Sequence, residues 1–146
     1  KALGEKDVTK ALHTGYISLL VGLAWGVVIG AVFLIIPSPI IQIFSSDTDI
    51  INRSIPVLLL AGINQPFLAF VIIISGALRG AGDTKFVMFV TALRFWLLLI
   101  PLTFVLVKYA HMDLKSVLIA EIIGHIVFDI VKMIRFRGKK WSEIQI

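Results

Sequence analysis

Long apolar runs dominate the pattern of residues along the chain. No Asp, Glu, Lys or Arg occurs from Ala11 to Ser46 or from Ser54 to Leu78. Both runs exceed the about 20 apolar residues that cross a bilayer as a helix, and their apolar residues come in blocks rather than with a period of 2 or 3.6. The pattern therefore predicts two transmembrane helices, over residues 13–36 and 54–78.

Two further apolar stretches carry isolated ionisable residues. Arg94 interrupts the stretch 86–107, and several polar residues interrupt the stretch 114–136. The predicted fold class is thus an all-α integral membrane protein with four transmembrane helices. A basic tail at residues 137–146 follows them.

Composition supports a membrane location. Of the 146 residues, 58% are hydrophobic and 16% are charged, whereas globular domains have about 45–50% apolar and about 25% charged residues. The net charge of +5 comes from short segments beside the helices, which points to anionic lipid as a partner and not to nucleic acid. Cysteine is absent, which excludes disulfides and thiolate metal sites.

Basic residues are distributed unevenly between the two ends of the predicted helices. The segments at one end hold ten Lys or Arg residues, and the loops at the other end hold three. Because basic residues favour the cytoplasmic side, we expect both chain ends in the cytoplasm and the protein in the inner or plasma membrane. The chain begins with Lys1, and we expect it to be a piece of a longer protein.

Small residues recur at every fourth position on two of the predicted helices. They are Ser18, Gly22, Gly26 and Gly30 on the first helix, and Ser116, Ala120 and Gly124 on the last. Residues four positions apart share a helix face, and small residues let membrane helices approach closely. We expect packing faces, with a sliding surface between moving helices as the alternative.

Pro66 and Pro101 lie inside two predicted helices. Each lacks a backbone N–H and crowds the carbonyl four residues earlier, so we expect a kink near each. Asn64 and Gln65 precede Pro66. Their turn either lines a wet cavity reached by a substrate or ion, or contacts a neighbouring helix that satisfies its polar groups.

The ionisable residues of the last helix are candidates for a proton or cation path. Glu121, His125 and Asp129 recur at every fourth position and share one face. Ionisable residues inside a membrane indicate function by default; structural pairing with Arg94, Lys132 or another helix is the favoured interpretation, and a metal site is less well supported. Arg94 lies deep in its helix, where we expect it to pair with Glu121 or Asp129; a substrate-facing role and extension toward the headgroups are the alternatives.

The segment 76–84 reads GALRGAGDT. It is neither a Walker A loop nor a G-x-G-x-x-G motif, so it does not indicate phosphate cradling. Gly76 and Gly80 are spaced for close helix packing, and Gly80 with Gly82 permits a tight turn.

Polar residues of the same segment have predicted capping and pairing roles. Asp83 or Thr84 can cap the helix that follows. Arg79 can pair with Asp83 or extend toward the headgroups.

Here the chain resembles the multidrug and toxic compound extrusion (MATE) family, whose tenth helix ends in G-x-L-R-G-x-G-D-T. Three further matches follow the family order. They are Trp96 with Ile100-Pro101-Leu102, RFRGKKW at 135–141, and ALGEKDVTKA at 2–11. The resemblance covers nearly the whole chain.

The resemblance implies a twelve-helix transporter built from two six-helix bundles. Residues 1–146 would form helices nine to twelve, the C-terminal part of the second bundle, and their partners would be the bilayer and the N-terminal helices of the same transporter. The implied function is secondary active antiport, in which small organic substrates such as drugs or organic cations leave by alternating access as Na⁺ or H⁺ enters. The ion is transported and is not a cofactor, and no enzymatic activity is implied.

Leu68 stands where sodium-coupled members carry an acidic residue, so we do not expect cation binding there.

Three other functions agree less well with the sequence. A lipid-linked saccharide flippase of the same superfamily would need several arginines facing a cavity, and the sequence offers only Arg94. A four-helix membrane scaffold is disfavoured by the interior charges. A hydrolase is disfavoured because neither H-E-x-x-H nor a nucleophile elbow accompanies the acidic residues.

Overall fold

The computed structural model describes residues 8–110 and 113–138, which form helices joined by short connections. The elements are α1 (Val8–Ile35), α2 (Pro37–Gln42), α3 (Thr48–Gly80), α4 (Thr84–Leu93), the π-helical segment η1 (Arg94–Leu99), α5 (Ile100–Ala110) and α6 (Asp113–Arg137). This confirms the all-α class. Residues 2–7 of the matching segment and residues 139–146 of the predicted tail lie outside the described residues.

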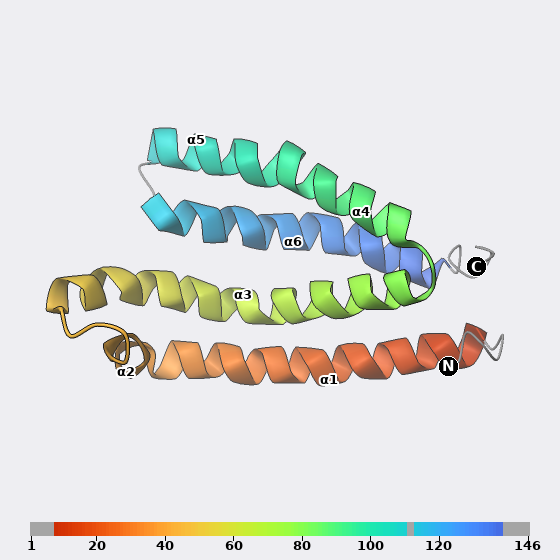
Figure 1. Cartoon of the computed structure of the whole chain (residues 1–146), viewed down its shortest axis with the longest axis horizontal. Helices are drawn as coiled ribbons and strands as arrows, with labels where there is room; N and C mark the ends of the chain where they lie inside the picture. The colour runs from red at the N-terminus through yellow and green to blue at the C-terminus, as the bar shows by residue number, and fades with distance from the viewer. Residues whose placement is uncertain (1–7, 111–112, 139–146) are drawn as a thin grey trace.

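The helices form two antiparallel hairpins that lie side by side (Figure 1). α1 packs along α3, and α6 packs against α3 and against the rod formed by α4, η1 and α5. The start of α1, the end of α6 and the α3–α4 turn lie at one end of the bundle. This arrangement is the one expected of helices that cross a bilayer in alternating directions.

Within the described residues, three stretches are long and apolar enough to cross a membrane, which makes the chain a multi-pass membrane protein. They are Leu12–Ile35, Thr48–Gly80 and Thr84–Ala110. α6 runs alongside them, but Glu121, Asp129 and Lys132 interrupt its apolar sequence and it is not among the three. A fourth transmembrane helix therefore stays a prediction.

The predicted contact face of α1 is confirmed at its glycines. A methyl group added to Gly30 would lie 2.6 Å from the Gly62 carbonyl oxygen of α3, and one added to Gly26 would also meet α3. Gly76 and Gly80 differ, because a methyl group at either would meet no atom of the described residues within 4 Å. The close packing predicted for these two glycines is therefore wrong for this part of the structure.

The two prolines have different effects on their helices. α3 continues through Pro66 without a break, and the carbonyl of Gly62, which Pro66 cannot bond, faces the backbone of α1 at Gly30. Near Pro101 the irregularity takes the form of the π-helical segment η1, which ends just before it. The missing N–H of a proline is thus accommodated by close packing in one helix and by altered helical geometry in the other.

The α3–α4 turn corrects two predictions about its polar residues. Gly82 has a φ of 86°, the left-handed conformation expected of a tight turn. The turn directs Asp83 toward the end of α6, where its Oδ2 accepts a hydrogen bond from Arg135 Nε at 2.7 Å, and Asp83 makes no side-chain capping bond. Arg79 does not pair with Asp83; its Nε donates to the Ser75 carbonyl at 3.2 Å.

Gly30→Ala should lower the thermal unfolding midpoint of the intact protein in detergent. The added methyl has no room against α3, and overpacking costs about 1–3 kcal/mol. Gly76→Ala is the matched control, because its methyl meets open space and Ala favours a helix over Gly by about 0.5–1 kcal/mol. Tryptophan fluorescence during heating measures both variants, and equal midpoints would contradict this packing.

Candidate functional site

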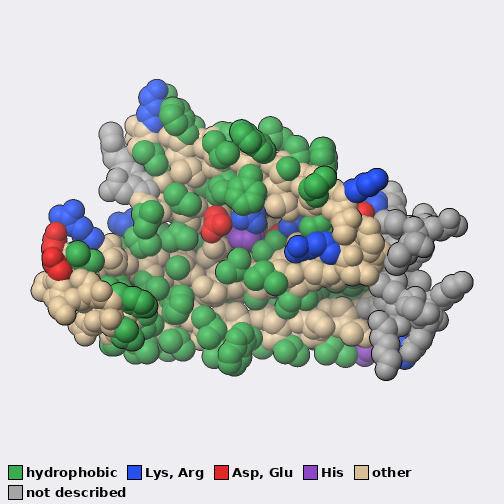
Figure 2. Space-filling model, viewed as in Figure 1, with side chains coloured by type: hydrophobic (Ala, Val, Ile, Leu, Met, Phe, Trp, Pro, Cys, Tyr) green, Lys and Arg blue, Asp and Glu red, His purple; other side chains and the backbone are tan. Residues whose placement is uncertain are grey.

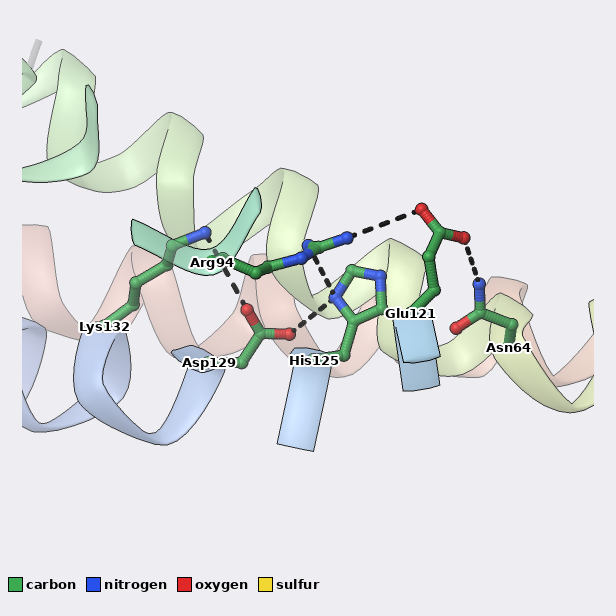
Figure 3. A network of polar contacts seen from close by, with 6 residues as sticks. All are labelled: Asn64, Arg94, Glu121, His125, Asp129 and Lys132. Carbon is green, nitrogen blue, oxygen red and sulfur yellow. Dashed lines mark hydrogen bonds and ion pairs between the residues drawn. The ribbon is translucent and has the colours of Figure 1, made fainter. Parts of the chain in front are cut away.

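Polar side chains from three elements converge between α3, η1 and α6 (Figure 3). We call this group the polar network; it consists of Asn64, Arg94, Glu121, His125, Asp129 and Lys132. Figure 2 shows an otherwise largely hydrophobic face with charged and histidine side chains in a hollow between α3 and the α4–α5 rod. The sequence predicted five of these residues as site residues, and Lys132 is the addition.

Arg94 is the centre of the network. It is 6% exposed, its Nη2 donates to Glu121 Oε1 at 3.4 Å, and its Nη1 lies 3.2 Å from His125 Nδ1. The predicted pairing with a carboxylate is confirmed, with Glu121 as the partner. A methyl group on Gly124 would lie 3.3 Å from Arg94 Nε, so this small residue of α6 leaves room for the guanidinium.

Asn64 connects α3 to the network. Its Nδ2 donates to Glu121 Oε2 at 3.2 Å, so the two oxygens of Glu121 accept from different elements. The Asn64 side chain is buried, and its Oδ1 has no hydrogen-bond partner among the described residues. Movement of α3 relative to η1 would therefore break one of the bonds to Glu121.

His125 Nδ1 has two neighbours with opposite requirements. Arg94 Nη1 lies 3.2 Å from it and Asp129 Oδ2 lies 3.1 Å from it. An arginine N–H can only donate and an ionised carboxylate can only accept, so Nδ1 with a lone pair suits Arg94 and Nδ1 with a proton suits Asp129. One protonation state cannot satisfy both contacts.

Asp129 and Lys132 complete the charge balance of the network. Lys132 Nζ lies 3.8 Å from Asp129 Oδ1, and the lysine side chain is 2% exposed. With His125 neutral, the two cations Arg94 and Lys132 match the two carboxylates of the network. Buried charges are tolerated when they are paired in this way.

The predicted turn at 64–66 is divided between three surroundings. Asn64 joins the network, whereas Gln65 lies against α1 beside Gly30. Pro66 lines an apolar pocket of about 350 Å³, together with Phe70, His125 and Asp129. Successive helical residues point about 100° apart, so Asn64 and Gln65 do not form one site.

Other predicted residues lie apart from the network. Arg79 and Thr84 line a groove between α3 and α4, and Trp96 is 72% exposed on η1. Within the described ranges, no three His, Asp or Glu side chains gather in a way that could hold a metal ion. The chemistry available to the network is proton exchange and ion pairing.

These features define a class: a multi-pass helical membrane protein with a buried network of ionisable side chains. The MatE family model matches residues 1–105. The chain belongs to the MatE family, which confirms the family inferred from the motifs.

Three relatives illustrate the relationship. The chain is 33% identical to the probable multidrug resistance protein NorM of Thermotoga maritima over 142 residues, which cover 97% of this chain and 30% of the relative. It is 29% identical to the probable NorM of Mannheimia succiniciproducens, with 100% of this chain and 32% of the relative covered. It is 27% identical to the multidrug resistance protein MdtK of Photorhabdus laumondii, with 71% of this chain and 23% of the relative covered. The chain thus spans less than a third of the length of these curated relatives.

Arg94→Leu should destabilise the intact protein by about 2–4 kcal/mol, because removal of one partner leaves the other charge unpaired in a buried setting. The double variant Arg94→Leu/Glu121→Leu should recover most of that loss, since both charges are then absent. Thermal unfolding of the wild type, both single variants and the double variant in detergent completes the mutant cycle. Additive losses would show that the two side chains do not interact.

Proposed function

We propose that the chain is part of a cation-coupled antiporter that exports drugs or other small organic cations by alternating access. Three observations support this proposal: membership of the MatE family, relatives named multidrug resistance proteins, and three stretches able to cross a membrane. Transport rather than catalysis is the activity expected from that family. Na⁺ and H⁺ are both candidate coupling ions, and the polar network favours H⁺.

The contact geometry of His125 carries the argument for H⁺. Its Nδ1 lies within hydrogen-bond distance of both Arg94 and Asp129. Arrival of a proton at Nδ1 weakens the contact to Arg94 and strengthens the contact to Asp129, and loss of the proton reverses this.

The contacts of His125 also connect its protonation to the relative positions of the helices. Arg94 belongs to η1, Asp129 belongs to α6, and Asn64 of α3 reaches the network through Glu121. A change of partner at His125 therefore alters the free energy of the contact between α6 and η1, and Arg94 and Glu121 connect that contact to Asn64 of α3. A ligand shifts a conformational equilibrium when it favours one arrangement over the other, and the proton acts here as that ligand.

Efflux of ethidium from cells that carry the intact protein tests the proposal. With a proton gradient imposed, Glu121→Gln and His125→Ala should each slow efflux by at least about fivefold, the lower end of typical coupling between sites. Asp49→Asn and His13→Ala are matched controls, because both replaced side chains are exposed and lie outside the network.

Three outcomes would contradict parts of this proposal. Efflux driven by a sodium gradient alone would reject H⁺ as the coupling ion. Full proton-driven activity in both network variants would reject the role of the network. Absence of efflux under either gradient would reject cation export and favour the flippase and scaffold alternatives.

A further inference from the structure

A groove between α3 and α4 gathers basic side chains from four elements. Its volume is about 740 Å³. The basic residues that line it are Arg79, Lys85, Arg94 and Lys132, from α3, α4, η1 and α6 respectively. Arg79, Lys85 and Arg94 lie within 16 residues of the sequence and Lys132 follows 38 residues later; only Arg94 was expected to face a cavity.

The groove carries an excess of positive charge. None of the described side chains that line it is acidic. Glu121 and Asp129 balance Arg94 and Lys132 within the network, and the nearby Asp83 is engaged by Arg135 at 2.7 Å. Arg79 and Lys85 therefore contribute two positive charges for which the described residues offer no ion pair.

The basic residues extend from the rim of the groove toward the middle of the helices. Arg79 and Lys85 flank the α3–α4 turn, at the end of the bundle where α1 starts and α6 ends. Arg94 lies nine residues beyond Lys85, about 14 Å along the helix axis. Apolar side chains such as Ile72 and Met88 line the same groove, so one surface combines cations at a helix end with apolar walls.

Polar groups other than the basic residues also line this groove. The hydroxyl groups of Thr84 and Thr91 also belong to the lining residues. The groove thus presents N–H and O–H donors together with a positive potential, which is the chemistry that binds phosphate oxygens.

We propose that this groove binds the phosphate headgroup of an anionic membrane lipid. Arg79 and Lys85 bind the phosphate at the rim, and the acyl chains lie along the apolar walls formed by α3 and α4. A lipid fits better than a free anion because the groove is apolar over much of its lining and opens in a membrane-spanning part of the protein. Basic residues near a membrane surface attract anionic lipid by about 1 kcal/mol each. The phosphate contacts proposed here, at Arg79 and Lys85, are different from the His125 contacts proposed for the coupling proton.

The test uses the intact protein, delipidated in a neutral detergent. Its unfolding midpoint is followed by tryptophan fluorescence as dioctanoyl phosphatidylglycerol, dioctanoyl phosphatidylcholine or inorganic phosphate is titrated in. Only phosphatidylglycerol should raise the midpoint, and the rise should saturate. The double variant Arg79→Gln/Lys85→Gln should need about 30-fold more lipid for half of the effect, which corresponds to about fivefold for each charge removed.

A double variant with the same loss of charge serves as the control. Arg53→Gln/Lys108→Gln removes two exposed basic residues at the opposite end of the bundle and should respond to lipid as the wild type does. If the rim double variant fails to fold, Lys85→Gln alone should still show the fivefold weakening, because Lys85 is exposed.

An equal response to phosphatidylcholine would overturn the proposal, as would unchanged affinity in the rim variant or equal weakening in the control. Stabilisation by inorganic phosphate alone would also overturn it, since the site would then bind a free anion.

Discussion

The cationic side chain of Arg94 within a membrane helix is the constraint on which the arrangement of the second hairpin depends. An unpaired charge at this depth costs several kcal/mol, so the guanidinium requires acceptors from a neighbouring helix. α6 supplies Glu121 and His125 as neighbours and leaves space at Gly124. Because all three features lie on one face of α6, the pairing also sets the rotation of α6 about its axis and its position along η1.

The π-helical geometry of η1 is related to the same pairing of Arg94 with α6. It starts at Arg94 and ends at Leu99, so the wider helical turn begins at the residue that must reach α6. The residues that follow Arg94, Phe95 and Trp96, remain exposed. A π-helical turn changes the direction of side chains before it relative to those after it, and here it separates a buried cation from an exposed aromatic surface. Pro101 follows at the point where an ordinary helix would require its missing N–H.

The sequence predicted the features that depend on local pattern. Apolar runs located the long helices, the spacing of small residues located the contact of α1 with α3, and desolvation of Arg94 predicted a carboxylate partner. Predictions failed where the answer depends on the path of the chain between helices. Asp83 pairs with Arg135, 52 residues away, because the α3–α4 turn carries it to the end of α6. The basic groove could not be predicted for the same reason: its four cations come from elements whose neighbours only the tertiary structure establishes.

The polar network and the groove share two side chains, and this links the two proposals. Arg94 and Lys132 belong to the network and also line the groove. A proton taken up by the network adds a positive charge near these side chains and makes the groove more favourable for an anionic headgroup. The coupling free energy between two binding sites is the same in both directions. If a proton on the network favours lipid binding, a bound anionic lipid therefore raises the affinity of the network for a proton by the same factor. The lipid composition of the membrane would then alter how readily a transporter built on this network takes up its coupling proton, without contact between the lipid and the exported compound.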